Sequence, residues 1–410
     1  MKITRQFLNA IEDLGFEDPL PIQEKAIPMV FSGHDVIGIA QTGTGKTLAY
    51  GIPIVQHVKY AKIDQARGLI LVPTRELVLQ VEEQLVKFAK YTDLRILPLM
   101  GGKSKQDQIV RIKEGVDIIV STPGRLMELY LMGEIVLKRI EILVLDEADR
   151  MMDMGFMPQL RDLLEVIPTK RQNLLFSATF SDRIEELSYE FLEFPKRIEI
   201  APQASTVSTI IQNAFHIPNF KTKLFWLEKC LNDSSEEFKR VIIFCRTKKR
   251  ADSVANYIGR KVDENVRVIH SNKGQSSRLN AFKSFKNGEL RFLVTTDVSS
   301  RGIDIDEVSH VINFDIPVKI EDYTHRIGRT GRVYKVGQAI SFVDEAESFT
   351  FKRIQKLIGQ DISLDPIDSE FPRAEYLPGE RKEIGIAVDR EKRIINPNYQ
   401  GAFHEKKRKR

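Results

Sequence analysis

The sequence alternates short apolar runs with segments whose apolar residues recur every three or four positions. Runs of four to six Val, Ile and Leu residues are typical of parallel strands buried on both faces, and the longer segments are typical of helices with one buried side. This alternation predicts an α/β fold with doubly wound parallel sheets. The predicted strands span residues 35–39, 68–72, 117–120, 140–145 and 173–176, and then 240–245, 266–269, 291–294, 310–314 and 339–343.

The alternation pauses once, at a stretch rich in Pro, Ser and Thr. At about 150 residues per domain, the 410 residues suffice for two or three domains. After residue 360 the pattern fades into prolines and mixed charges, which favours an extended or flexible segment. The sequence therefore predicts an N-terminal domain over 1–202, a linker over 203–209, a C-terminal domain over 210–360 and a basic extension over 361–410.

The positive charge is concentrated at the end of the chain. The whole sequence has a net charge of +5, and residues 371–410 contain 11 basic and 6 acidic side chains, which account for the entire excess. The last five residues are Lys-Lys-Arg-Lys-Arg, whose mutual repulsion favours a solvated tail. Attraction to nucleic-acid phosphates is the functional interpretation of this tail, and improved solubility is the alternative.

The composition excludes several classes of protein. With 42% hydrophobic and 29% charged residues, the chain is not collagen-like, coiled-coil or disulfide-stapled. Its two cysteines, Cys230 and Cys245, belong to no metal-binding pattern and are expected to be reduced core residues. The sequence shows neither a signal-peptide pattern nor an apolar stretch of about 18 residues. We therefore expect a cytoplasmic protein without a membrane partner.

A glycine-rich motif follows the first predicted strand and precedes a helical segment. It matches the P-loop pattern except that Ala40 replaces the first glycine. Gly43 and Gly45 allow backbone N–H groups to converge on phosphate oxygens, and the helix adds its positive N-terminal end. Lys46 supplies a cation and Thr47 a hydroxyl for Mg²⁺, although an ordinary glycine-rich turn is the simpler alternative. The predicted phosphate-binding residues are Ala40, Gln41, Thr42, Gly43, Thr44, Gly45, Lys46 and Thr47.

A second motif places two carboxylates at the end of another predicted strand. Asp146 ends the apolar run and Glu147 follows it. In an open parallel sheet, ligands bind at this edge. Asp146 can hold Mg²⁺, and Glu147 can orient or deprotonate an attacking water. A solvated turn is the alternative for these acids alone, but their position after a P-loop favours nucleotide hydrolysis.

With these motifs the sequence resembles the DEAD-box ATP-dependent RNA helicases of superfamily 2, over nearly all of residues 14–343. The resemblance implies two tandem RecA-like domains, ATP and Mg²⁺ as cofactors, and RNA as partner. The motifs occur in the family's order: GFEDPLPIQ (15–23), AQTGTGKT (40–47), PTREL (73–77), GG (101–102), TPGR (122–125), DEAD (146–149), SAT (177–179), VIIFCRT (241–247), QSSR (275–278), TTDVSSRGIDI (295–305) and HRIGRTGR (325–332).

The resemblance assigns further residues to the ATP site. Gln23 would recognise the adenine edge, Phe16 would stack on the base, and Asp304 would contact the ribose. Arg329 and Arg332 would be arginine fingers that stabilise the charge developing on the γ-phosphate. Most relatives have a further aromatic residue before the first motif, at a position that precedes Met1 here. This leaves two interpretations, a weaker nucleotide affinity or a shortened sequence.

The resemblance also implies how nucleotide and RNA are coupled. ATP would favour a closed state of the two domains because it has more contacts there than in the open state. Hydrolysis would then allow the domains to separate. Ser177 and Thr179 would couple this state to RNA, while His325 and Arg326 would link to the acids of the DEAD motif, including Asp149.

The residues expected to contact RNA are of types that bind sugar and phosphate. Arg and Thr donate hydrogen bonds to phosphate oxygens, and Gly allows close approach of backbone N–H groups. The few aromatic residues in these motifs predict little base readout. The preference for RNA over DNA is implied by the resemblance alone, and contacts to 2′-hydroxyl groups would provide it. By resemblance the RNA-binding residues are Pro73, Thr74, Arg75, Gly102, Thr122, Gly124, Arg125, Gln275, Arg278, Thr295 and Arg301, with Asp297 in support.

The predicted function is an RNA-stimulated ATPase that closes on ATP and RNA and locally unwinds short duplexes or remodels ribonucleoproteins, as a monomer. Three alternatives stay open. The first is a superfamily 2 DNA helicase or translocase. The second is an ATP-gated RNA clamp that holds a partner assembly, and the motifs do not separate it from a helicase. The third is a P-loop enzyme such as a kinase, which leaves the motifs of the second domain unexplained.

Overall fold

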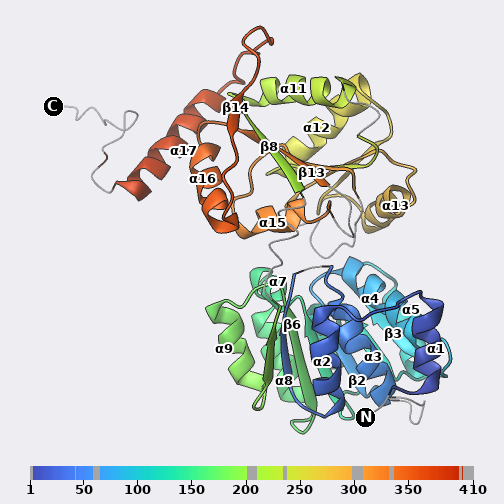
Figure 1. Cartoon of the computed structure of the whole chain (residues 1–410). Coiled ribbons are helices and arrows are strands. Elements are labelled where there is room, and N and C mark those ends of the chain that lie inside the picture. Colours follow the sequence, from blue (N-terminus) through green and yellow to red (C-terminus); the bar gives the residue numbers. More distant parts are fainter. Residues whose placement is uncertain are drawn as a thin grey trace. The chain divides into compact units, whose positions relative to one another are not determined.

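The computed structural model divides into two compact units, each described here by itself (Figure 1). The first contains the elements from α1 to β7, and the second those from β8 to α17. The predicted linker at 203–209 lies outside the described residues, so the predicted domain boundaries stay predictions. The structure describes residues 3–41, 43–58, 65–200, 210–233, 238–297, 308–331, 337–396 and 399.

The first unit is built on a parallel sheet of seven strands in the order β3-β4-β2-β5-β6-β1-β7. Every pair of neighbouring strands runs parallel, as the apolar runs predict. The strands are β1 (Val36–Ile39), β2 (Gly68–Leu71), β3 (Ile96–Leu99), β4 (Ile118–Ser121), β5 (Ile142–Asp146), β6 (Gln172–Ser177) and β7 (Lys196–Glu199).

Two hydrophobic clusters cover the two faces of this sheet. Along β5, Val144 belongs to one cluster and Leu145 to the other, since successive side chains of a strand point to opposite faces. The first cluster also includes buried residues of α2, α3 and α4, and the second includes buried residues of α6, α8 and α9. The helices are α1 (Arg5–Asp13), α2 (Pro21–Phe31), α3 (Lys46–Val58), α4 (Arg75–Phe88), α5 (Lys105–Lys113), α6 (Pro123–Leu131), α7 (Ala148–Asp153), α8 (Met157–Val166) and α9 (Asp182–Phe191).

The second unit repeats the same sheet topology. Its parallel strands lie in the order β10-β11-β9-β12-β13-β8-β14, which is the order of the first sheet counted from β8. Its strands are β8 (Ile210–His216), β9 (Val241–Phe244), β10 (Val266–Ile269), β11 (Phe292–Thr295), β12 (His310–Asn313), β13 (Gly337–Val343) and β14 (Leu364–Pro366). Its described helices are α11 (Phe220–Asp233), α12 (Lys248–Lys261), α13 (Gln275–Lys286), α15 (Glu321–Ile327), α16 (Glu347–Ile358) and α17 (Glu380–Ile395).

The predicted α/β fold is confirmed, and each predicted strand overlaps an observed one within about two residues. Four strands, β3, β7, β8 and β14, were not predicted. β3 contains Pro98, which is tolerated because β3 is an edge strand. β7 and β8 expose several polar side chains, so they lack the continuous apolar run of a central strand.

The C-terminal segment differs from the prediction of an extended or flexible tail over 361–410. β14 pairs with β8, and α17 is fixed to the second unit by two polar contacts. Glu380 accepts a hydrogen bond from the backbone N–H of Phe220 at 2.7 Å, and Glu391 pairs with Arg353 at 2.9 Å. The prediction is therefore wrong for α17 (Glu380–Ile395). The basic run at 406–410 lies outside the described residues.

No helix in the described ranges combines the length and apolar character needed to cross a bilayer. Cys245 lies in the core, as predicted, whereas Cys230 is half-buried and packs against the core of the second unit.

Candidate active site

The sequence motifs of the first unit meet at one edge of its sheet. All except GFEDPLPIQ (15–23), which precedes β1, follow the carboxyl end of a strand, and in a parallel sheet these ends lie on the same side. The predicted nucleotide motifs follow β1 and β5, and the predicted coupling motif follows β6; these three strands are neighbours in the sheet. The predicted RNA motifs follow β2, β3 and β4, which are also neighbours. The two predicted sites therefore adjoin along this edge, where β2 pairs with β5.

The P-loop connects β1 to α3 in the expected way. Gly43 and Gly45 have φ values of 84° and 82°, which lie in the left-handed region that favours glycine. The Lys46 ammonium is buried and donates to the carbonyl of Ala40 at 2.6 Å. Burial lowers the pKa of Lys46, against the attraction of Asp146. Thr44 caps the loop by donating to the Gln41 carbonyl at 2.7 Å, and Thr42 lies outside the described residues.

Gln23 fixes the start of α2 to the P-loop. Its Oε1 accepts from the Leu20 N–H at 2.9 Å, and its Nε2 donates to the Gly45 carbonyl at 3.2 Å. A Cβ at Gly45 would lie 2.2 Å from this Nε2, so a larger residue there would displace the Gln23 amide from its hydrogen bond. Phe16, the predicted stacking residue, is 49% exposed and accessible to a planar ligand.

Asp146 is buried at the end of β5. Its carboxylate accepts from the Tyr50 hydroxyl at 2.7 Å and from the Glu147 N–H at 2.8 Å. Burial raises the pKa of Asp146 to about 6, although Lys46 opposes this shift. Tyr50 was not among the predicted site residues. Its position four residues after Lys46 in α3 places both side chains on one helical face, which is a usable signal.

Glu147 has a backbone conformation that side chains rarely adopt, with φ at 54°. It begins α7, and its carboxylate pairs with Arg150 at 2.6 Å, with both side chains buried. A left-handed residue other than glycine costs about 1–3 kcal/mol and persists only where the surroundings fix it. Arg150 is a second residue that the sequence analysis missed, three positions along the same helix.

Asp149 connects the acidic motif to the end of β6. Its Oδ2 accepts from the N–H groups of Ala178 and Thr179 at 3.2 and 3.1 Å, and from the Thr179 hydroxyl at 3.1 Å. The Ser177 hydroxyl is buried and accepts from the Thr179 N–H at 3.4 Å. The structure thus brings three predicted coupling residues, Asp149, Ser177 and Thr179, into one hydrogen-bonded cluster.

The predicted RNA residues of the first unit lie at the same edge, where Gly102 and Gly124 are exposed and Thr74, Thr122 and Arg125 are buried. Arg125 is held by Glu128 at 3.0 Å and by the Lys103 carbonyl at 3.4 Å. Gly124 is exposed, and a Cβ there would meet no atom within 4 Å. These residues follow β2, β3 and β4 and are Pro73, Thr74, Arg75, Gly102, Thr122, Gly124 and Arg125.

In the second unit, Arg326 is fully engaged by its own unit. Its guanidinium makes a bidentate pair with Asp297 at 2.6 and 2.8 Å, and donates to Asn313 Oδ1 at 3.0 Å and the Asp315 carbonyl at 2.7 Å. Its predicted link to the DEAD acids stays a prediction. The observed bonds indicate a positioning role between the motifs that contain Asp297 and Arg326.

The other predicted residues of the second unit lie on several of its elements. Thr295 ends β11, Arg278 lies on α13, and Gln275 begins that helix. Arg329 is buried, and His325 lies 3.9 Å from Asp322. Arg301, Asp304 and Arg332 lie outside the described residues.

A buried ion network supports the second-unit motifs and was not predicted. The ammonium of Lys223 lies 2.7 Å from Glu347, 3.0 Å from the Phe314 carbonyl and 3.7 Å from Asp315. Arg246 pairs with Glu347, and Arg250 with Asp315. Burial alone would lower the pKa of Lys223, but Glu347 and Asp315 raise it. No local sequence signal identifies this network because its members are far apart along the chain.

The donor set of the first unit fits Mg²⁺ bound together with a nucleotide. In the described part of the chain, no group of three or more His, Cys, Asp or Glu side chains could hold a metal ion by itself. Mg²⁺ at nucleotide sites usually takes only one or two protein carboxylates, with waters and phosphates as its other ligands. The carboxylate of Asp146 and the hydroxyl of Thr47 are donors of this kind.

Comparison with known proteins finds similarity in both units. The DEAD/DEAH box helicase family model matches residues 20–187, and the helicase conserved C-terminal domain model matches 222–334. The DEAD-box ATP-dependent RNA helicase CshA of Geobacillus kaustophilus is 40% identical over 86% of this chain and 75% of its own length. RhpA of Helicobacter pylori, another DEAD-box ATP-dependent RNA helicase, is 39% identical over 87% and 71%.

Solved structures show the same architecture. S. cerevisiae Dbp5 bound to RNA and ADP BeF3 has a TM-score of 0.79 at 28% identity, and the match covers 94% of this chain and 97% of that one. The DEAD-box helicase Mss116 bound to ssRNA and UDP-BeF has a TM-score of 0.82 at 25% identity, and the match covers 98% and 86%. The predicted tandem RecA-like fold is confirmed by these matches.

Proposed function

The chain belongs to the DEAD/DEAH box helicase family, and we propose that it is an ATP-dependent RNA helicase that locally unwinds short duplexes or remodels ribonucleoproteins. One observation supports this most directly. The nucleotide motifs after β1 and β5 and the coupling motif after β6 adjoin the RNA motifs after β2, β3 and β4 along one sheet edge. Both ligands can therefore contact one rigid sheet.

ATP hydrolysis is assigned to the side chains at the nucleotide end of this edge. The P-loop N–H groups and Lys46 hold the phosphates, and Glu147 orients the attacking water and accepts its proton. Thr47 and Asp146 would hold Mg²⁺, which supplies positive charge at the phosphate oxygens when bound. The proposed arginine fingers of the second unit, Arg329 and Arg332, add positive charge at the γ-phosphate in the transition state.

RNA binding is assigned to donors that recognise the sugar-phosphate backbone. Arg75, Arg125 and Thr122 donate to phosphate oxygens, while Gly124 lets the strand approach the start of α6. The second unit adds donors from Gln275, Arg278, Thr295 and Arg301. Two solved relatives are bound to RNA or ssRNA, which supports RNA as the ligand here.

Coupling between the two ligands is assigned to the Asp149 cluster and to the movement of the two units relative to each other. Asp149 follows the acids that act on ATP, and it holds Thr179 at the end of the neighbouring strand. A change at Asp146 and Glu147 can therefore reach the motif after β6. ATP would stabilise the closed, RNA-gripping state, and hydrolysis would release it. We propose that one chain suffices, so that the protein acts as a monomer.

The decisive experiment compares nucleic-acid ligands in one ATPase assay and then follows strand separation. We expect stimulation by RNA and little by DNA of the same sequence, with ATP-dependent unwinding of short RNA duplexes but not of long ones. Breaking the stacking of base pairs costs about 1.4 kcal/mol per step in DNA. Bending out a few pairs therefore melts only a short helix. Stronger stimulation by DNA would indicate a DNA helicase or translocase. Persistent RNA binding without strand separation would indicate a clamp.

A further inference from the structure

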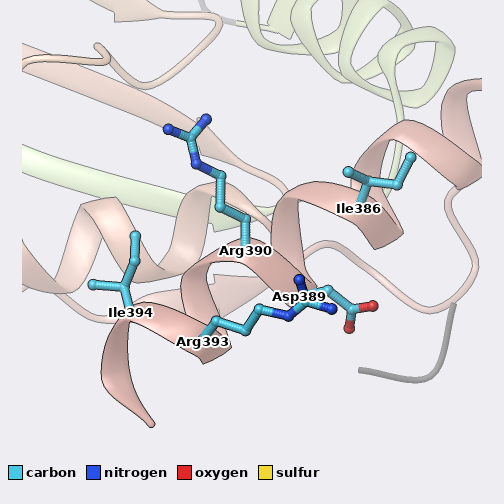
Figure 2. A pocket seen from close by; sticks show the side chains of 5 residues that line it. All are labelled: Ile386, Asp389, Arg390, Arg393 and Ile394. Atoms are coloured by element: carbon cyan, nitrogen blue, oxygen red, sulfur yellow. The ribbon is translucent and has the colours of Figure 1, made fainter. Parts of the chain in front are cut away.

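A cavity of about 620 Å³ lies at the edge of the first sheet opposite the nucleotide motifs. Its walls are the C-terminal ends of α2 and α3 and the residues that precede β5 and β6. This volume is typical of small-molecule sites. A smaller cavity of about 320 Å³ lies along α17 (Figure 2). All of its described lining residues come from that single helix, so no second element shapes a site there.

The larger cavity presents more positive than negative charge. Lys170 and Arg171 are adjacent in the loop before β6, and His57 ends α3. The single carboxylate among the described lining residues is that of Glu141. Its Oε2 lies 3.1 Å from Nε2 of His57 and is therefore already paired. An anionic group is therefore the ligand that the wall favours.

Arg171 has an unused hydrogen-bond donor. Its Nη1 donates to the Pro168 carbonyl, while its Nε is buried and has no hydrogen-bond partner among the described residues. The nearby carboxylate of Asp35 is taken by the N–H groups of Asn173 and Glu193 at 2.7 and 2.8 Å. A guanidinium with a free donor binds phosphate and carboxylate groups in a planar, bidentate geometry. The Nε atom itself is covered, so an oxyanion would bind the half-buried guanidinium from the side of the cavity, next to Lys170.

The remaining wall is apolar. Val30 and Pro53 are already buried, whereas Phe31 is half-buried and keeps accessible surface on which an apolar body can pack. A free inorganic ion would leave this surface of Phe31 uncovered. The wall thus fits a small molecule with an anionic head and an apolar or aromatic body.

The same four elements connect this cavity to the nucleotide motifs. α3 begins with Lys46 and has His57 in its last turn, about 16 Å away at 1.5 Å per residue. β5 runs from the residue after Glu141 to Asp146, again about 16 Å. α2 and β6 likewise extend from the cavity to Gln23 and Ser177. A ligand that displaces the cavity ends of these helices and strands also displaces their opposite ends, which lie at the predicted phosphate-binding motifs.

We propose that this cavity is an effector site for a small anion with an apolar body, whose phosphate or carboxylate binds Arg171 and Lys170. Binding at the cavity is independent of the helicase assignment, while the effect on nucleotide affinity rests on the proposed ATP site. By linkage, a ligand that changes nucleotide affinity has its own affinity changed by the same factor.

The binding test uses the full chain with its nucleotide site saturated by ADP and Mg²⁺, so that phosphate probes do not compete there. Phenyl phosphate, benzoate and neutral benzamide are titrated by calorimetry. We expect one of the two anions to bind at least tenfold more tightly than benzamide. The tighter anion identifies phosphate or carboxylate as the natural head group. Equal affinity for all three, or no binding, would overturn the assignment.

Three variants locate the bound anion. Arg171→Gln is expected to weaken binding of the preferred anion at least tenfold. Lys170→Gln is expected to weaken it at least threefold, and because Lys170 is exposed, this substitution should not disturb the fold. Arg111→Gln, an exposed arginine on α5, is the matched control and should bind as the unaltered chain does. Unchanged binding in both cavity variants would place the anion elsewhere and overturn the assignment.

The effector role has a separate readout. The affinity for a fluorescent ADP analogue is measured with and without a saturating concentration of the preferred anion. We expect at least a threefold change in the unaltered chain and none in Arg171→Gln. An unchanged affinity would overturn the effector role. Failure of the analogue to bind even without the anion would instead contradict the proposed ATP site.

Discussion

Glu147 combines a strained backbone with a buried ion pair, and both features fix the direction of its carboxylate. Replacing Glu147 with Gln keeps the shape and a hydrogen bond to Arg150 but removes the proton acceptor. Because a general base contributes about 10²–10⁴-fold, we expect RNA-stimulated ATP turnover to fall by that factor while ATP-dependent RNA binding survives. The exposed Glu165→Gln is the control, measured in the same phosphate-release assay. Turnover equal to that of the control would remove Glu147 from catalysis.

A substitution at Gly124 can test RNA binding without disturbing the fold. It lies in the first turn of α6, and a Cβ there has open space. Alanine is favoured over glycine in helices by up to about 1 kcal/mol, so Gly124→Ala should not lower the melting temperature. If a strand approaches this backbone, the added methyl group should weaken ATP-dependent RNA affinity about 5-fold, on the order of 1 kcal/mol. Fluorescence anisotropy with labelled RNA measures this loss.

The control for Gly124 lies on a helix outside the predicted RNA motifs. Gly259→Ala on α12 places its Cβ in ordinary contact with Val266 at 3.4 Å. It should leave RNA affinity unchanged. A loss of affinity shared by both variants, or by neither, would contradict the contact assigned to Gly124.

At the scale of elements, Lys223 on α11 stabilises the buried carboxylates of the second unit. Removing one partner of a buried ion pair typically costs about 3–5 kcal/mol, because the other charges stay buried without compensation. We expect this loss for Lys223→Met, and a small change for the exposed Lys221→Met on the same helix. Trp226 is the only tryptophan and lies on α11, so its fluorescence during urea unfolding reports on this unit. Equal urea midpoints for Lys223→Met and Lys221→Met would show that Arg246 and Arg250 alone compensate the charge of the buried carboxylates.

The central strands and the catalytic motifs could be predicted from the sequence because their pattern is local. Asp146 ends an apolar run, and Lys46 follows two glycines, so a few neighbouring residues reveal each role. β7 and β14 were missed because they are short or half-exposed and depend on pairing with β1 and β8. The Lys223 network was missed because folding alone brings its members together. α17 was missed for a similar reason, since contacts with Arg353 and Phe220 fix its place.

At the scale of the whole molecule, the two units share one strand order but contain different chemistry at equivalent edges. The first has the phosphate loop and the acids, whereas the second has the arginines of its last motif. This division predicts that the first unit binds nucleotide but hydrolyses it slowly without an added cation. Arginine fingers raise phosphoryl-transfer rates by about 10³–10⁵-fold.

Arg332→Ala tests this division of labour between the units. Since the guanidinium would act only on the charge that develops at the γ-phosphate, we expect turnover to fall by about 10³-fold or more. RNA affinity measured without nucleotide should stay within a factor of two, because the predicted RNA-binding residues are unchanged. The exposed Arg260→Ala at the end of α12 controls for loss of charge on the second unit. If Arg332→Ala hydrolyses ATP as fast as this control, the second unit supplies no cation through Arg332, and Arg329 becomes the residue to test.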